Sequence, residues 1–197
     1  MTILRLLYKK KSSFAFNNIM SSHIRTLVEL QKHSHKLFHN RNLFGFNKNN
    51  LIVWKTYNDW YKDTNKYSNF LLSQKINKGD RIGMISNNSY EWATLAYATY
   101  MIGGVFVPMY QNQLIEECNY IVNNSDIKIL FCNNFKKYKS CVNNIDSKNL
   151  DNVFFFDHQD HPQNAYNHIN NKKNILDSNL YNRINENDIA NIIYTSG

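Results

Sequence analysis

The sequence predicts an α/β fold, a mostly parallel sheet covered by helices. From residue 81 onward, short apolar runs alternate with longer helical patterns, an order typical of parallel strands joined by helices. The 197 residues, of which 43% are hydrophobic and 14% aromatic, are enough to form one substantial core. The sequence contains no visible internal repeat, which argues against a stacked-repeat fold.

The first elements are indicated by local start and stop signals. Residues 26–40 carry apolar side chains at helical spacing and end at polar breakers, which predicts a helix. Two apolar runs, 43–46 and 51–54, flank a polar turn and predict a β-hairpin. Thr56 is expected to cap a helix over residues 57–73, because its hydroxyl can accept from the free N–H groups of the first turn. The buried face of this helix is expected to hold Trp60, Tyr67, Phe70 and Leu71.

The middle of the chain predicts a strand–helix–strand unit. Residues 81–86 read as a buried strand, and Ser89 is placed to cap the helix that follows. That helix, residues 90–101, is apolar on nearly all sides, so it must be covered by protein. The glycine pair at 103–104 ends it before a strand at residues 105–107.

The same order continues with a helix at residues 114–123 and a strand at 127–132. Residues 153–156 predict one more buried strand, and residues 157–187 read as a polar stretch. A final apolar strand is expected at residues 189–194.

The excess positive charge is confined to the first quarter of the chain. The formal net charge is +8, and residues 1–50 hold nine Lys and Arg side chains against one acid, Glu29. The remaining 147 residues are balanced, with 14 basic and 14 acidic side chains. Residues 51–197 have no excess of basic side chains that could follow a phosphate backbone. The sequence therefore argues against a nucleic-acid partner.

The amino-terminal arm has the composition of an organellar transit peptide. Residues 1–22 contain no acid and four bases, with Arg5 interrupting the apolar residues. We therefore predict a leader over residues 1–25 and a folded part over 26–197, with the mitochondrion or another organelle as the destination. The alternative is a basic leader that carries no targeting signal, in a cytoplasmic protein.

A membrane-spanning helix is not expected. The charge-free run at residues 92–115 is long enough, but Pro108 and the glycines at 103–104 break it. This leaves peripheral association with a membrane open. Cys118, Cys132 and Cys141 are too few and too widely spaced for a zinc site, so we expect reduced, mostly buried thiols.

A phosphate could bind where the last predicted strand ends. In open α/β sheets, ligands gather outside the carboxyl ends of strands, and here the chain continues into Thr195, Ser196 and Gly197. Glycine lets backbone N–H groups approach phosphate oxygens, and hydroxyls can donate to phosphate or coordinate Mg²⁺. On these residues alone, an ordinary loop after a strand is the better interpretation.

Other candidate metal ligands favour a surface interpretation. His35 and His39 are spaced at i, i+4 but lack the glutamate of a zinc-protease helix. The acids and histidines within residues 157–161 are too closely spaced for a defined metal site. No Ser-His-Asp order or nucleophile elbow appears.

Taken together, the ordered motifs resemble the AMP-forming acyl-CoA synthetases of the adenylate-forming superfamily, and among them the long-chain fatty acid branch. The similarity covers roughly residues 26–197. It rests on the order and spacing of Thr26-Leu27-Val28-Glu29-Leu30, Trp54-Lys55-Thr56-Tyr57, Lys78-Gly79-Asp80-Arg81-Ile82-Gly83, Asn88-Ser89-Tyr90-Glu91-Trp92, Gly103-Gly104-Val105-Phe106-Val107-Pro108-Met109-Tyr110, Ile129-Leu130-Phe131-Cys132 and Asp188-Ile189-Ala190-Asn191-Ile192-Ile193-Tyr194-Thr195-Ser196-Gly197.

The resemblance implies a two-step ligase reaction. A fatty acid carboxylate attacks the α-phosphate of ATP to give an acyl-adenylate and pyrophosphate, and the thiol of coenzyme A then displaces AMP. Thr195, Ser196 and Gly197 correspond to the start of the family's phosphate loop, with Thr195 also expected at Mg²⁺.

In the family, the rest of that loop, the acyl pocket and the lid with its catalytic lysine lie beyond the position of Gly197. The resemblance therefore implies an incomplete amino-terminal part of the adenylate-forming fold. No catalytic residue is assigned here, and the fragment alone is expected to be inactive. A non-catalytic interaction module derived from this lobe is the alternative function.

Overall fold

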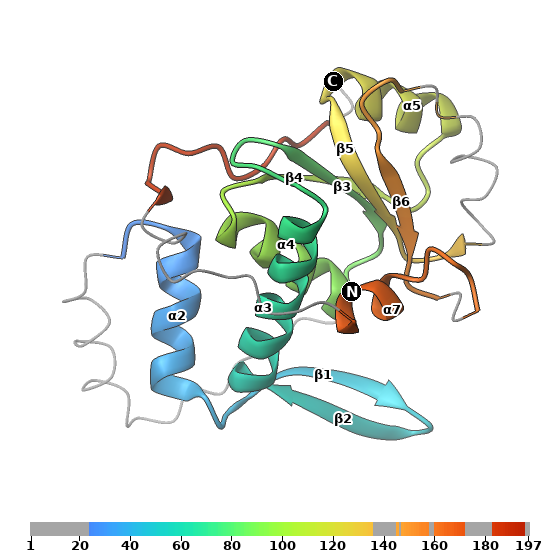
Figure 1. The fold of residues 1–197 in the computed structure, drawn as a ribbon. Coiled ribbons are helices and arrows are strands. Elements are labelled where there is room, and N and C mark those ends of the chain that lie inside the picture. The colour runs from blue at the N-terminus through green and yellow to red at the C-terminus, as the bar shows by residue number, and fades with distance from the viewer. Residues whose placement is uncertain (1–23, 136–144, 146, 158–159, 172–182, 196–197) are drawn as a thin grey trace.

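The computed structural model describes residues 24–135, 145, 147–157, 160–171 and 183–195. Figure 1 shows a helix-covered parallel sheet with a separate hairpin at one end of the molecule. The hairpin pairs β1 (Asn42–Lys48) with β2 (Leu51–Thr56). The larger sheet has the strand order β4-β3-β5-β6, formed by Val105–Tyr110, Arg81–Ser86, Ile127–Cys132 and Asn152–Phe155 in that order. All the pairings in the larger sheet are parallel. The predicted α/β fold with a mostly parallel, helix-covered sheet is confirmed.

The amino-terminal helix and the hairpin form where the sequence predicted them. Helix α2 (Leu27–Phe38) begins with a capping box, in which Thr26 accepts from the Glu29 N–H and the Glu29 carboxylate accepts from the Thr26 N–H. Strands β1 (Asn42–Lys48) and β2 (Leu51–Thr56) pair antiparallel. The turn between them has positive φ at Asn49 and Asn50, the backbone that a two-residue hairpin turn needs.

Helix α3 (Tyr57–Ser73) starts with a second capping box, in which Thr56 and Asp59 exchange bonds in the same way. Its buried face includes the four predicted side chains, Trp60, Tyr67, Phe70 and Leu71. The local capping signals therefore fixed where both helices begin.

The parallel sheet follows the predicted strand–helix alternation. Helix α4 is capped by Ser89 as expected, and the strand after it runs to Tyr110, three residues longer than predicted. The elements in chain order are β3 (Arg81–Ser86), α4 (Tyr90–Met101), β4 (Val105–Tyr110), α5 (Ile115–Asn124), β5 (Ile127–Cys132) and β6 (Asn152–Phe155).

The core lies on both faces of this sheet. Side chains of β3 alternate between the two sides, with Ile82 and Met84 in one buried cluster and Ile85 in the other. Helices α3 and α4 contribute to the first cluster, and α5 contributes to the second. A parallel strand buried on both faces carries apolar residues without a solvent side, which explains the unbroken apolar character of residues 82–85.

In the last quarter of the chain, the predicted final strand was wrong and one helix was not predicted. Residues 189–194 form an extended segment rather than a strand, joined to β4 by one isolated bridge between Asn191 and Phe106. The segment lies at the outer edge of the sheet, and Ile189 and Ile193 are 66% and 68% exposed. The stretch predicted to be only polar contains a short helix, α7 (Ala165–Asn170), with Asn164 as its cap.

The predicted leader falls almost wholly outside the described residues, so its role stays a prediction. Within the part of the chain that the structure describes, none of the helices combines the length and the apolar character needed to cross a bilayer. Cys118 and Cys132 are buried, as expected for structural thiols, and Cys141 lies outside the described residues.

We expect Gly83→Ala to destabilise the fold by about 1–3 kcal/mol, because overpacking a full core forces its neighbours to shift. A Cβ at this position would lie 2.6 Å from Ile127 Cδ1 and 3.0 Å from Leu130 Cδ1. Urea unfolding followed by circular dichroism measures the change. Asn87→Ala, at an exposed position directly after the same strand, is the control and should change stability by less than about 0.5 kcal/mol. Equal midpoints for the two variants would show that β3 and β5 are not packed tightly here.

Candidate functional site

The carboxyl ends of the parallel strands meet at one edge of the sheet. From β3 the chain passes to β4 on one side and then crosses to β5 on the other. Helices α4 and α5, which make these connections, contribute to the clusters on opposite faces. This change of direction beside β3 is the topological switch point at which open α/β sheets bind ligands.

The segment carrying Thr195 runs parallel to β4 toward this edge. The Phe106 N–H donates to Ala190 O at 2.9 Å, and the Ile192 N–H donates to Phe106 O at 3.1 Å. The Tyr100 hydroxyl, from α4, donates to Asn191 Oδ1 at 2.7 Å. These contacts fix the direction in which the segment leaves the sheet.

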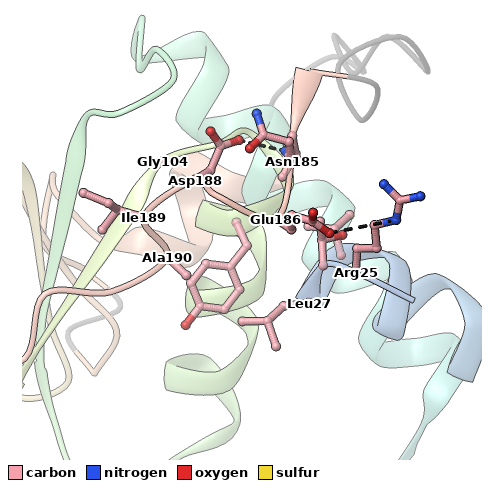
Figure 2. A pocket seen from close by; sticks show the side chains of 13 residues that line it. Arg25, Leu27, Gly104, Asn185, Glu186, Asp188, Ile189 and Ala190 are labelled. Carbon is pink, nitrogen blue, oxygen red and sulfur yellow. Dashed lines mark hydrogen bonds and ion pairs between the residues drawn. The ribbon is translucent and has the colours of Figure 1, made fainter. Parts of the chain in front are cut away.

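Ionic contacts anchor the beginning of the segment. Lys78 Nζ lies 2.7 Å from Asp188 Oδ2 and also donates to Arg183 O at 2.7 Å. The hydrogen bond from Lys78 lowers the pKa of Asp188. Figure 2 shows this region, where Arg25 lies 3.9 Å from Glu186 across a cavity of about 130 Å³. The cavity adjoins Gly103 and Gly104, at the amino end of β4, so it lies at the edge opposite the predicted phosphate site.

At the other end of the segment, Thr195 is exposed. The preceding residue is held in place, because the Tyr194 hydroxyl donates to Asn124 Oδ1 at 2.6 Å and its ring packs edge-on against Tyr120. Ser196 and Gly197 lie outside the described residues. The assignment of Thr195, Ser196 and Gly197 to phosphate, and of Thr195 to Mg²⁺, therefore stays a prediction.

A larger cavity, of about 860 Å³, opens beside the carboxyl end of β3. Its walls come from the hairpin, α3, the loop after β3 and α7. This cavity was not predicted, because its lining comes from three stretches of the chain, residues 44–67, 88–91 and 166–170, that only the fold brings together. Its residues are Phe44, Gly45, Phe46, Lys55, Asp63, Lys66, Tyr67, Asn88, Ser89, Tyr90, Glu91, Tyr166, Ile169 and Asn170.

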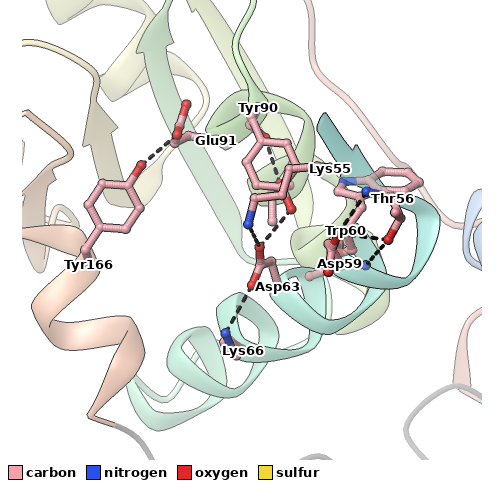
Figure 3. A network of polar contacts seen from close by, with 11 residues as sticks. Lys55, Thr56, Asp59, Trp60, Asp63, Lys66, Tyr90, Glu91 and Tyr166 are labelled. Carbon is pink, nitrogen blue, oxygen red and sulfur yellow. Dashed lines mark hydrogen bonds and ion pairs between the residues drawn. The ribbon is translucent and has the colours of Figure 1, made fainter. Parts of the chain in front are cut away.

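Asp63 is the centre of the polar contacts in this cavity (Figure 3). Its carboxylate lies 3.1 Å from both Lys55 Nζ and Lys66 Nζ, and it accepts from the Tyr90 hydroxyl at 2.8 Å. Burial alone would raise the pKa of Asp63, but the hydrogen bonds from Tyr90, Lys66 and Lys55 outweigh it and lower that pKa.

Tyr90 and Tyr166 keep their protons. Burial raises the pKa of Tyr90 far above its ordinary value, and the hydrogen bond to Asp63 adds to the effect. Burial and the bond to Glu91, 2.6 Å from the hydroxyl, do the same for the pKa of Tyr166. Near neutral pH the Asp63 carboxylate is therefore ionised and both phenols are neutral donors, and the Asp63 contacts join the hairpin, α3 and α4.

Of the histidines considered from the sequence, His35 and His161 pack against aromatic rings, His39 is exposed, and His158 lies outside the described residues. His35 stacks on Tyr61 with ring centroids 4.2 Å apart, and its Nε2 lies 3.1 Å from Asn58 Oδ1. His161 packs against Phe135 at 4.5 Å. Among the described residues there is no group of three or more His, Cys, Asp or Glu side chains that could share a metal ion.

Residues 36–197 match the AMP-binding enzyme family. The chain belongs to this family. Curated relatives include the mitochondrial medium-chain acyl-CoA ligase ACSF2 of Danio rerio, 35% identical over 79 residues, covering 36% of this chain and 13% of the relative. The long-chain-fatty-acid CoA ligase FadD15 of Mycobacterium bovis is 34% identical over 61 residues, covering 31% of this chain and 10% of the relative. The chain thus matches only about a tenth of the length of these AMP-binding enzymes.

Solved structures of AMP-binding enzymes share the fold. The amino-terminal domain of FACL13 from Mycobacterium tuberculosis superimposes with a TM-score of 0.72 at 16% identity, covering 88% of this chain and 42% of that one. The long-chain-fatty-acid CoA ligase FadD1 from Archaeoglobus fulgidus gives the same TM-score at 15% identity, covering 88% of this chain and 35% of that one.

We expect Asp63→Asn to lower the free energy of unfolding by about 1–3 kcal/mol at pH 7, because it breaks a charged hydrogen-bond network. The folded-state pKa of Asp63 is lowered. The stability that the carboxylate contributes is therefore present above about pH 4 and is lost as pH falls through the folded-state pKa. Urea titrations between pH 3 and 7 should show the variant and the wild type converging in acid.

Asp151→Asn, which removes an exposed carboxylate, is the matched control and should follow the wild type within about 0.5 kcal/mol. A constant difference between Asp63→Asn and the wild type across the whole pH range would contradict the assigned role of the charge.

Proposed function

We propose that the chain forms the amino-terminal part of the adenylation domain of an ATP-dependent fatty acyl-CoA ligase. The observation that carries this proposal is the family match over residues 36–197, which ends at the predicted phosphate-binding residues. The names of the relatives, several of them fatty acid CoA ligases, support a carboxylate substrate activated for transfer to coenzyme A.

In the proposed reaction, a carboxylate oxygen attacks the α-phosphorus of ATP and pyrophosphate leaves. The thiolate of coenzyme A then attacks the acyl carbon, and AMP leaves with the bonding electrons. Negative charge on the phosphate oxygens grows during the first step, so preorganised donors at that position lower its barrier. The Thr195 and Ser196 hydroxyls and the Gly197 N–H would supply donors at the edge where β3 and β4 end.

Mg²⁺ would accompany ATP as part of the substrate. Of the residues predicted to bind phosphate, the structure describes only Thr195, whose hydroxyl could provide one oxygen ligand. Mg²⁺ commonly keeps several waters and binds substrate phosphates together with one or two protein groups. A single hydroxyl fits this pattern, and phosphate oxygens and water would complete the coordination.

The second candidate function is a non-catalytic interaction module. For both candidate functions, the ligase and the interaction module, we propose that residues 1–197 alone form no acyl-adenylate. The family resemblance places the acyl pocket and the catalytic lysine outside these residues.

We expect Thr195→Val, made in the complete ligase, to slow adenylation by about 30-fold to 1000-fold, which corresponds to losing roughly 2–4 kcal/mol from one donor at developing charge. Valine keeps the shape of threonine and deletes the hydroxyl. The assay is fatty-acid-dependent exchange of pyrophosphate into ATP, with the melting temperature measured in parallel.

The matched control is Ile193→Val, which trims an exposed side chain on the same segment and should leave exchange unchanged. Residues 1–197 alone, assayed beside the ligase, should give no exchange. Full exchange by a folded Thr195→Val ligase would refute the phosphate assignment, and exchange by residues 1–197 alone would refute the proposed dependence on further residues.

We also propose that residues 1–25 direct the protein to an organelle. Fusing them to a fluorescent protein should give an organellar pattern, because a basic, acid-free, hydroxyl-containing arm suits import receptors. Replacing Arg5 and Lys9 with glutamate should abolish that pattern. A diffuse signal from the unmodified fusion would favour the cytoplasmic alternative.

A further inference from the structure

Strand β2 exposes an unusual run of apolar side chains. Leu51, Ile52 and Trp54 are 71%, 65% and 51% exposed, and Val53 between them is 38% exposed. The hairpin projects from the body of the molecule in Figure 1, with β2 outermost at that end. Single exposed apolar residues are ordinary, but a contiguous group of this kind marks an interaction surface.

The exposed side chains lie on both faces of the hairpin. The register pairs Phe46 with Val53 and Gly45 with Trp54. Because neighbouring side chains in a strand point to opposite faces, Leu51 and Val53 share one face, and Ile52 and Trp54 share the other. A flat protein partner would cover only one of these faces. A lipid layer can contact both faces of a hairpin whose edge strand lies in it.

The charge around the hairpin complements an anionic surface. Between Glu29 and Asp59 the sequence has five basic residues and no acid. Lys36 and Arg41 are exposed and belong to the end of α2 and its link to β1, at the same end of the molecule as the hairpin (Figure 1). Of the two acids that follow in α3, Asp63 is paired with Lys55 and Lys66, and Asp59 caps the helix through Thr56.

The dimensions also suit an interfacial position. Leu51 and Trp54 are three residues apart, about 10 Å along an extended strand. In a strand that lies parallel to the membrane surface, this length is the extent of apolar contact along the interface, and tryptophan favours the headgroup level. The polar turn at Asn49 and Asn50 suits a strand that lies along the interface better than one that enters tip first.

We propose that β2 lies in the interface of an anionic lipid membrane, with Leu51, Ile52 and Trp54 in contact with the acyl-chain boundary and with Lys36 and Arg41 facing the phosphates. This goes beyond the proposed ligase activity and does not depend on it, because membrane binding is measured without ATP, fatty acid or coenzyme A.

The test uses the full chain of 197 residues and sedimentation with vesicles of phosphatidylcholine, alone or with about one third phosphatidylserine. We expect binding to the anionic vesicles. The double variant Leu51→Ser/Ile52→Ser should weaken it by about tenfold or more, since apolar area drives insertion. The matched control, Leu114→Ser/Ile189→Ser, removes two side chains of similar exposure, 64% and 66%, elsewhere on the surface and should bind like the wild type.

Trp54 gives a second readout of the same contact. It is more exposed than the buried Trp60 and the half-buried Trp92. Its emission should therefore shift to the blue on vesicle addition and be quenched by lipids brominated near the headgroup. Lys36→Gln/Arg41→Gln should reduce the preference for anionic vesicles, and raised salt should do the same by screening.

Several results would overturn the proposal. One is the absence of binding to anionic vesicles by the folded wild type. Another is equal binding by Leu51→Ser/Ile52→Ser and the wild type. A third is concentration-dependent dimerisation, without vesicle binding, that the same variant abolishes, because the hairpin would then dock a second copy. Circular dichroism melting shows that each variant is folded before its binding is compared.

Discussion

The structure depends on a central strand that is buried on both faces. Because Ile82 and Met84 of β3 face one helical layer and Ile85 faces the other, neither side of the sheet is available to solvent. Helices must cover both sides, so the chain has to change direction beside β3. Because the strands are parallel, their carboxyl ends share one edge, and the change of direction places the switch point beside β3 at that edge. The location of the candidate site is therefore a consequence of core packing.

Many of these helices and strands could be predicted from the sequence, because helix caps and apolar runs are local signals. The hydroxyls of Thr56 and Ser89 cap the helices that they were expected to cap, and the apolar run of β3 indicated a buried strand, as the structure shows. The membership of the AMP-binding family could also be predicted from ordered short motifs, although the two solved structures described above are only 15% and 16% identical to the chain.

The features that could not be predicted depend on partners far away in the sequence. The apolar run ending at Tyr194 has the composition of a strand, but only β4 pairs with it, through one bridge. Helix α7 is stabilised by Ala165 and Ile169, which pack into the core. Its six residues are too few to show a helical spacing of apolar side chains in the sequence. Asp63 looks like an ordinary helix-surface acid until Lys55 and Tyr90 are brought to it from neighbouring elements.

The edge of β4 also has a consequence for how the protein is made. The contact between Tyr100 and Asn191 joins residues 91 positions apart, so at ribosomal speeds the second partner is synthesised roughly 5 to 20 s after the first. During that interval the core of the sheet can already collapse, while the backbone groups of Phe106 have no partner from the 190–192 segment. An open strand edge of this kind is where nascent chains join one another or bind chaperones. Pairing of the late-arriving segment with Phe106 therefore also ends this vulnerable stage of synthesis.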